Sequence, residues 1–247
     1  MPDGSPRFSL VIPARNEEAY LPRLLDTVDA ARARYAGGAD AVEVIVADNA
    51  STDATAEIAR RRGCRVVSVE KRIIGAVRNG GAGAARGEIL CFVDADARIH
   101  PDTFGAIERM LDTGKIVGGA TGVRLERLSL GLAVTYALMV PLVWLTRMDT
   151  GVTICWREDF LAIGGYSEEL PAAEDVRLLL DLWRLGRRRG QRLGRARSAK
   201  AIASTRKFDR FGDWHYVTHM PRAIYWLIFR KGSFEGFVNR YWYSDQR

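Results

Sequence analysis

Two aspartates, Asp94 and Asp96, follow the apolar run 89–93. Alternate side chains of an extended strand point the same way, so we expect the two carboxylates to converge. Carboxylates held that close repel each other unless a cation lies between them, and Mg²⁺ or Mn²⁺ binds one or two carboxylates together with substrate phosphates. The pair predicts a metal and phosphate site. The plainer alternative is two solvated acids at the start of a loop.

Three further acids are candidates for ligand binding or proton transfer. Asp48 is the first polar residue after the apolar run 44–47, and its carboxylate can accept a hydrogen bond from a base N–H or a ribose hydroxyl. Glu174 and Asp175 open a strongly amphipathic segment. They suit either the first turn of a helix, where the dipole favours acids, or a general base that takes a proton from an attacking hydroxyl.

The loop 13–18 reads Pro-Ala-Arg-Asn-Glu-Glu. It contains no G-x-G-x-x-G, which argues against a dinucleotide-dependent oxidoreductase, and it lacks the glycine-rich, lysine-bearing pattern of a P-loop NTPase. Glu17 and Glu18 also fit favourable charge at a helix N-terminus. Ser51 and Asp53, further along, are better explained as helix caps than as ligand contacts.

The elements that would position these residues alternate between strand and helix in the first half of the chain. Strands are predicted at 8–13, 42–48, 65–69 and 88–96, and helices are predicted to begin near 21, 51, 75 and 101. This order predicts an α/β fold with a doubly wound, mostly parallel sheet. Such sheets bind ligands at the carboxyl ends of their strands.

The second half is less regular. Strands are predicted at 115–125 and 151–156, a short helix and turn at 157–166, and an amphipathic helix at 174–187. The uncharged segment 128–145 reaches the minimum length for a membrane span, but Pro141 would kink it. Three interpretations remain open for it: a helix at a membrane surface or subunit interface, ordinary core, or a span.

The composition is that of a globular protein, with 47% hydrophobic and 27% charged residues among 247. The net charge of +7 suits nucleic acid, anionic lipid or a diphosphate ligand, and also a merely solvated basic surface. The three cysteines are widely spaced, which predicts reduced core thiols of a cytosolic protein, and no secretory signal is visible at the N-terminus.

Several motifs together resemble the family 2 glycosyltransferases, which have the GT-A fold. They are VIPARNEE, VADNASTD, GAVRNGGAGAARGEILCFVDAD, GGY and PAAEDVRLLLDLWRLGRR, in the family's order and spacing over about residues 8–190. The resemblance implies a nucleotide-sugar-binding GT-A catalytic domain over 1–205. It leaves 206–247 as a C-terminal helical extension, basic and aromatic in composition.

The resemblance also implies substrates and roles. The donor would be a nucleotide-diphosphate sugar, with UDP favoured, and the acceptor a hydroxyl. The implied nucleotide-sugar contacts are Pro13, Ala14, Glu17, Asp48, Arg78 and Asp94. Asp96, together with Asp94, would ligate Mn²⁺ or Mg²⁺. Asp175 would be the base, with Glu174 the weaker candidate, and the family's inverting majority implies direct displacement at the anomeric carbon.

The C-terminal extension leaves its role open. His215 is expected to be a packed or surface histidine; as a third metal ligand it would favour a retaining mechanism. The basic and aromatic residues of 214–243 favour an anionic membrane surface over nucleic acid, and hence a lipid-linked acceptor and a place in the cytoplasm at the inner face of the cell membrane. The alternative is a helical pair that covers the sheet and packs a homodimer.

Two other functions compete with the transferase. A sugar nucleotidyltransferase would need a glycine-rich basic loop directly after the first strand, and 13–18 has none. A non-catalytic nucleotide-sugar-binding module would have lost acids that this chain retains.

Overall fold

The computed structural model describes residues 5–146, 148–169, 173–214 and 217, and these fall into two compact units. The larger unit comprises 1–124 and 147–203; the smaller comprises 125–146 and 204–247. Residues 125–146 therefore group with the C-terminal segment, whereas the predicted division at 205/206 leaves them in the catalytic domain. Most of the predicted extension, His215 included, lies outside the described residues.

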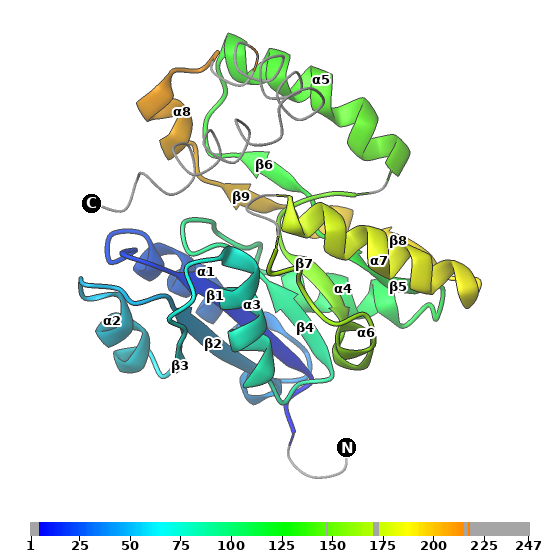
Figure 1. The fold of residues 1–247 in the computed structure, drawn as a ribbon, viewed down its shortest axis with the longest axis horizontal. Helices are drawn as coiled ribbons and strands as arrows, with labels where there is room; N and C mark the ends of the chain where they lie inside the picture. The colour runs from blue at the N-terminus through cyan, green and yellow to red at the C-terminus, as the bar shows by residue number, and fades with distance from the viewer. Residues whose placement is uncertain (1–4, 147, 170–172, 215–216, 218–247) are drawn as a thin grey trace. The chain divides into compact units, whose positions relative to one another are not determined.

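The larger unit contains a seven-stranded sheet with the order β3-β2-β1-β4-β7-β5-β8 (Figure 1). Its strands are β1 (Phe8–Ala14), β2 (Val42–Asp48), β3 (Arg65–Ser68), β4 (Ile89–Phe92), β5 (Ile116–Ala120), β7 (Thr153–Trp156) and β8 (Arg192–Arg195). Only the pairings of β7, with β4 and with β5, are antiparallel in this sheet. The predicted α/β fold with a mostly parallel sheet is confirmed.

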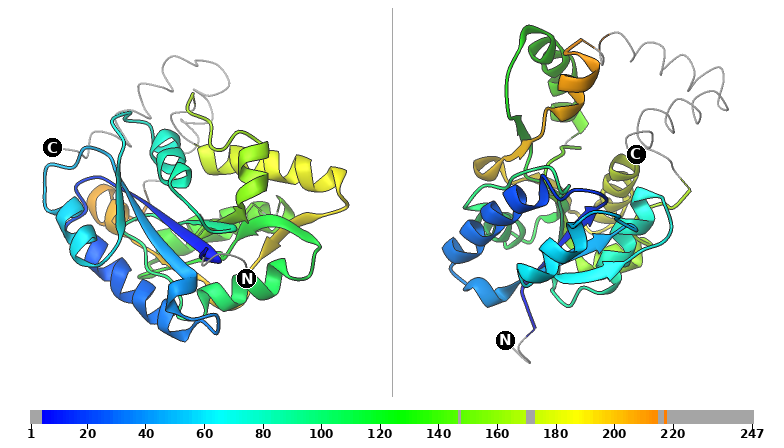
Figure 2. Two further views of the ribbon diagram at one scale, coloured as in Figure 1. Left: turned by 90° about the horizontal axis from the view of Figure 1, so that it is seen from below. Right: turned by 90° about the vertical axis from the view of Figure 1, so that its left-hand side faces the viewer.

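Helices cover both faces of this sheet (Figure 2, left). The first face packs against α1 (Leu21–Arg34), α2 (Thr55–Arg61) and α4 (Thr103–Leu111). The second face packs against α3 (Ile74–Gly83), α6 (Arg157–Ala162) and α7 (Glu174–Arg188). Strand alternation produces the two layers, because Phe8 and Leu10 of β1 join the first core and Val11 joins the second.

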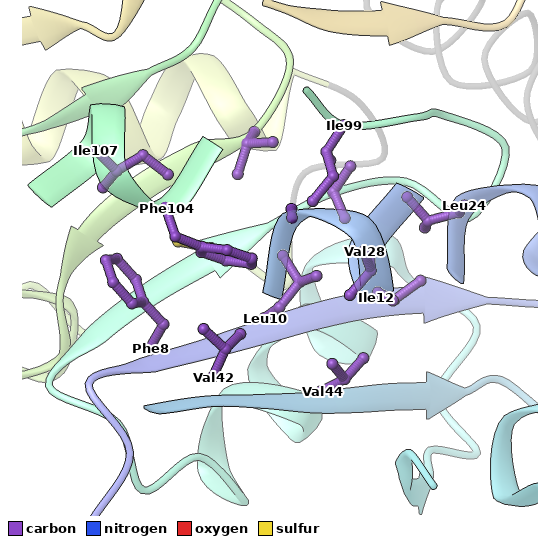
Figure 3. Close-up of a cluster of buried hydrophobic side chains, with 14 of the residues drawn as sticks. Phe8, Leu10, Ile12, Leu24, Val28, Val42, Val44, Ile99, Phe104 and Ile107 are labelled. Atoms are coloured by element: carbon purple, nitrogen blue, oxygen red, sulfur yellow. The ribbon is translucent and has the colours of Figure 1, made fainter. Parts of the chain in front are cut away.

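The first core is centred on aromatic rings (Figure 3). Phe8 on β1 meets Phe104 on α4 with ring centroids 5.2 Å apart, and Tyr35 meets Phe8 edge-on at 5.4 Å. Leu10, Ile12, Leu24 and Val28 extend the cluster toward the carboxyl end of the strands. The cluster fixes β1, whose loop enters the candidate site.

Glycines let α3 approach the sheet closely. A Cβ added at Gly81 would overlap the side chain of Val11 on β1 and press on Ala47 of β2. A Cβ at Gly75 would overlap the backbone oxygen of Ser167. The predicted small-residue helix at 75–86 is therefore real, over 74–83, and its glycines are the reason that it lies close to β1 and β2.

The structure differs from the predicted elements at several ends. Strand β4 ends at Phe92 rather than at 96, because Asp94–Ala97 form a turn closed by the Ala97 N–H and the Asp94 carbonyl. The predicted strand 115–125 divides into β5 and β6 (Val123–Leu125) at Gly122, whose φ is 79°. Helix α4 begins at Thr103, after a turn that contains Pro101. Elements that the sequence analysis did not predict are β8, β9 (Ala201–Ala203) and the short 3₁₀ turns η1 (Ala39–Ala41) and η2 (Arg197–Ala199). Helix α8 (Arg206–Phe211) lies at the start of the predicted helical extension.

The described part of the smaller unit includes α5 (Leu130–Thr146), which contains most of the apolar segment 128–145, and α8. Arg127 forms ion pairs with Asp209 of α8 and with Asp213, which follows this helix, each at 2.6 Å. In the part of the chain that is described, no helix has both the length and the apolar character needed to cross a membrane.

Replacing Phe104 by alanine is expected to lower the free energy of unfolding by about 3–5 kcal/mol, because the fully buried ring would leave a cavity beside Phe8. Urea denaturation followed by circular dichroism measures the loss. The matched control is Leu161→Ala on α6, where the side chain is 62% exposed, and its effect should stay under about 0.5 kcal/mol. Similar losses in the two variants would contradict this description of the core.

Candidate active site

Three loops meet at the carboxyl edge of the parallel strands. β1, β2 and β4 are neighbours in the sheet, and Ala14 of β1 pairs with Asp48 of β2 in register. Their ends lead into residues 15–18, 49–55 and 94–97. The predicted ligand edge therefore brings the first loop, Asp48 and the Asp94–Asp96 pair to one side of the sheet.

A buried arginine of α3 joins this edge to the start of α7. Arg78 donates from Nη2 to Asp94 at 2.8 Å, and from Nη1 to Glu174 at 2.5 Å and to Asp175 at 3.0 Å. The side chain of Arg78 is only 6% exposed, whereas that of Asp175 is 32% and that of Asp94 61% exposed. The proposed donor-side acid and the two proposed bases thus share one cation, with one end of the cluster open to solvent.

Tyr166 forms the apolar floor of this cluster. Its buried ring lies under the Arg78 guanidinium, 5.1 Å from the ring centroid, and meets Phe92 of β4 edge-on at 5.0 Å. Its hydroxyl is buried and makes no hydrogen bond among the described residues. The sequence analysis assigned no role to Tyr166. The GGY motif that contains it was the available signal.

The charges of the cluster do not balance. One guanidinium faces three carboxylates, from Asp94, Glu174 and Asp175. Burial raises the pKa of Asp175 and of Glu174, and the neighbouring acids add to the rise against the opposing charge of Arg78. Although burial alone would lower the pKa of Arg78, the carboxylates raise it well above its usual range. The excess of negative charge leaves room for a proton or a further cation.

The Asp94–Asp96 pair is arranged by a turn and not by strand pleating. The carbonyl of Asp94 accepts the Ala97 N–H at 3.0 Å, Ala95 is buried between the acids, and Asp96 is half-buried. Among the residues that the structure describes, no group of three or more His, Cys, Asp or Glu side chains could hold a metal ion. Two carboxylates are nevertheless enough for Mg²⁺ or Mn²⁺ when phosphates complete the coordination.

Hydrogen bonds lock the first loop to the loop after β2. Glu17 donates its N–H to the Thr55 hydroxyl at 2.7 Å, and Thr52 donates its N–H to the Asn16 side chain at 2.8 Å. The N-cap residue of α2 is Ala54, without a side-chain cap, so the predicted capping by Ser51 or Asp53 is wrong. Ser51 accepts the Asn16 N–H instead, and Asp53 accepts the Thr55 N–H at 2.9 Å. Asn16 has a φ of 52°, a left-handed conformation that this network holds in place. These bonds tie the two loops together on the side of the sheet where the nucleotide pocket is expected.

The structure brings most of the predicted site residues to one region of the larger unit. Asp94, Glu174 and Asp175 meet through Arg78, and Asp48 and Glu17 are buried at the same edge. Arg78 was expected to face the nucleotide, and two of its nitrogens bind carboxylates instead; its contact with a ligand remains a prediction. His215 lies outside the described residues, so its metal role also remains a prediction.

Comparison with known proteins identifies a protein family that matches more than half of this chain. Residues 9–148 match the family described as Glycosyl transferase family 2. The 4,4'-diaponeurosporenoate glycosyltransferase of Staphylococcus haemolyticus is 39% identical over 100 residues, 38% of this chain and 25% of that protein. The undecaprenyl-phosphate 4-deoxy-4-formamido-L-arabinose transferase of Pseudomonas paraeruginosa is 37% identical over 123 residues, which are 44% of this chain and 34% of that protein. The chain spans a quarter to a third of the length of these relatives.

Solved structures share the fold. S. aureus TarS in complex with UDP-GlcNAc has a TM-score of 0.60 and 21% identity, covering 80% of this chain and 58% of TarS. The mannosyltransferase PcManGT of Pyrobaculum calidifontis, in complex with GDP-Man and Mn²⁺, has a TM-score of 0.60 and 24% identity. The match covers 75% of this chain and 55% of PcManGT. At these identities the likeness establishes the fold.

We expect Arg78→Met to lower the free energy of unfolding by about 3–5 kcal/mol at neutral pH, because Glu174 and Asp175 would lose their counter-charge. Both acids have raised pKa values in the folded protein. They therefore favour folding at low pH, and this contribution is lost as the pH rises through the folded values. The penalty should shrink between pH 8 and pH 5 in urea denaturation.

The control for this measurement is Arg109→Met. Arg109 is 63% exposed and pairs with Asp102, so its loss should cost under about 1 kcal/mol at either pH. A penalty for Arg78→Met that equals this control, or that does not change with pH, would show that the buried cluster is wrongly described.

Proposed function

The chain belongs to glycosyl transferase family 2, and from this premise we propose that it transfers a sugar from a nucleotide-diphosphate sugar to an acceptor hydroxyl. The observation that carries the proposal is the Arg78 cluster. It ties Asp94, at the donor edge of the sheet, to Glu174 and Asp175, which open α7. A transferase needs a donor site and a proton acceptor side by side, and the acids of this cluster are the proposed source of both.

The nucleotide is proposed to lie against Pro13, Ala14 and Glu17, with Asp48 beneath its base. All four residues are buried at the ends of β1 and β2. The hydrogen bonds between the two loops support this proposal, because loops ordered before the ligand arrives reduce the entropy lost on binding.

A divalent ion fits the acidic pair, since the cluster carries more negative than positive charge and Asp94 is exposed. Asp96 and Asp94 would hold Mn²⁺ or Mg²⁺, which would neutralise charge on the departing diphosphate. PcManGT, with the same fold, is known in complex with Mn²⁺.

Asp175 is the proposed general base. The acceptor oxygen attacks the anomeric carbon, the bond from that carbon to the diphosphate oxygen breaks, and the hydroxyl proton passes to the Asp175 carboxylate. Its raised pKa brings the carboxylate nearer to working pH, which favours proton transfer. Arg78 holds it in place by donating from Nη1 at 3.0 Å. Direct attack inverts the configuration, the outcome that the family's majority favours.

The acceptor is proposed to be lipid-linked and reached from a membrane surface on the cytoplasmic side. One relative carries undecaprenyl-phosphate in its name. In the smaller unit, Leu128, Leu130 and Leu138 are 76%, 74% and 60% exposed. Exposed apolar side chains on or next to a helix suit the interface of a bilayer.

Metal removal tests the donor site. Calorimetry should find that UDP binds at least about 10-fold more weakly after EDTA treatment, because the diphosphate loses its neutralising cation. Mn²⁺ should restore binding to the unaltered chain and not to Asp96→Ala. Asp102→Ala is the control, because this half-buried acid pairs with Arg109, and the variant should bind as the unaltered chain does. Equal binding with and without metal would refute the metal site.

The base is tested by Asp175→Asn. We expect release of UDP from a UDP-sugar in the presence of acceptor to fall by about 10²–10⁴-fold, with UDP affinity retained. Asp181→Asn is the matched control on α7; Asp181 forms only surface pairs with Arg177 and Arg184, and its replacement should leave turnover unchanged. Turnover that survives in Asp175→Asn and disappears in Glu174→Gln would move the role to Glu174.

A further inference from the structure

The side chain of Asn79 on α3 is hydrogen-bonded to both backbone groups of Tyr166. Its Oδ1 accepts the Tyr166 N–H at 2.9 Å, and its Nδ2 donates to the Tyr166 carbonyl at 3.0 Å. The same nitrogen also donates to Glu168 at 2.9 Å. A side-chain amide has two N–H donors, so Asn79 has none left for a substrate. Its hydrogen bonds therefore act on the segment that contains Tyr166.

Glu168 determines which way the Asn79 amide points. Its Oε1 accepts from Nδ2 of Asn79, and its Oε2 accepts from Lys71 at 2.7 Å. These two hydrogen bonds lower the pKa of Glu168, so the acid is ionised at neutral pH. An amide turned by 180° would direct its oxygen at this carboxylate and at the Tyr166 carbonyl. Only one orientation of the amide is therefore favourable.

Glycines shape the chain around this contact. Gly164 and Gly165 have left-handed backbones, with φ of 81° and 72°, a conformation that side chains other than glycine rarely adopt. A Cβ added at Gly165 would overlap Oδ1 of Asn79. One turn earlier on α3, a Cβ added at Gly75 would overlap the carbonyl oxygen of Ser167. The segment around Tyr166 thus follows α3 along a path that only glycine permits at these positions.

The residue that Asn79 holds supports the proposed base. The guanidinium carbon of Arg78 lies 5.1 Å from the centroid of the Tyr166 ring, and Arg78 donates to the Asp175 carboxylate at 3.0 Å. Asn79 directly follows Arg78, so two neighbouring residues of α3 contact Tyr166 at its backbone and at its ring. Without Asn79, the ring and the guanidinium above it would lose their fixed position. A shift of about 1 Å at a reacting group can cost about 10²-fold in rate.

We infer that Asn79 is a positioning residue for glycosyl transfer, which holds Tyr166 so that Arg78 keeps Asp175 in place for the attacking acceptor. The inference rests on the proposed function, in which Asp175 is the general base. Because Asn79 has no donor free for a substrate, its loss should lower the rate of transfer and leave donor affinity unchanged. A purely structural role would instead lower stability alone.

The kinetics of UDP release from a panel of UDP-sugars, with water as the acceptor, test the inference together with calorimetry of UDP and Mn²⁺. Asn79→Ala removes all three hydrogen bonds. We expect its kcat to fall about 10- to 100-fold, while UDP affinity stays within about twofold. Asn79→Asp keeps the size and the acceptor for the Tyr166 N–H but loses the donor, and it should lower kcat in the same way. Circular dichroism establishes that each variant is folded.

The same substitution in a chain without the base shows whether Asn79 acts through it. If Asn79 only places Asp175, then adding Asn79→Ala to Asp175→Asn should change the residual turnover by less than about twofold. The control is Gln191→Ala, which also removes a side-chain amide that donates to the backbone, at the Gly114 carbonyl, 3.1 Å away. Gln191 and Gly114 precede β8 and β5, at the opposite edge of the sheet, so kcat and UDP affinity should not change.

The outcomes separate this inference from the function on which it rests. Unchanged kcat in both Asn79 variants, a loss of UDP affinity as large as the loss of kcat, or a full further loss of turnover in Asp175→Asn would overturn the positioning role and leave the transferase standing. No binding of any nucleotide diphosphate would overturn the proposed function and the inference with it.

Discussion

The site depends on one buried guanidinium. Arg78 holds Asp94, Glu174 and Asp175, which come from the end of β4 and the start of α7, and no other described cation pairs with these acids. Burying such a group is costly unless every charge is paired, so the arrangement constrains the chain around it. Gly75 and Gly81 let α3 come close enough to the sheet to present Arg78, and Tyr166 closes the space beneath it. The packing of α3 and the chemistry of the site are therefore one structural problem.

The imbalance of charge in this cluster links structure to function. Three acids around one arginine repel each other, and a divalent ion with its diphosphate would redistribute that charge when the donor binds. The same repulsion and burial keep the pKa of Asp175 raised, which suits proton transfer. Without a ligand, the excess negative charge makes the cluster unfavourable. With the metal ion and the donor bound, the same three carboxylates would be stabilised.

Much of the fold could be predicted from local pattern. Continuous apolar runs were sufficient to predict the buried strands β1 and β2. The helical spacing of Leu21, Leu24, Leu25 and Val28 was sufficient to predict α1. Prediction failed where backbone pairing or a turn determines whether a strand forms and where it ends. Strand β8 lies in a basic stretch and buries only Leu193 and Gly194, so its sequence carries little strand signal. Strand β4 ends early because Asp94 starts a turn.

The site was predictable only in part, and for a related reason. Acids that directly follow apolar strands can be identified along the chain, as Asp48 and Asp94 were. The contact of Arg78 with Asp175 spans 97 residues, and nothing local specifies it. The two hydrogen bonds between the Asn79 side chain and the Tyr166 backbone span 87 residues, and no local pattern specifies them either.

A crystal structure of the chain with UDP and Mn²⁺, with the metal located by its anomalous scattering, tests the central claim most directly. The account predicts a single manganese peak within coordination distance of Asp96 and both phosphates, with Arg78 still bound to Asp175 beside it. A diphosphate bound away from Asp94 and Asp96, or an Arg78 side chain turned into solvent with Asp175 far from the donor, would contradict it.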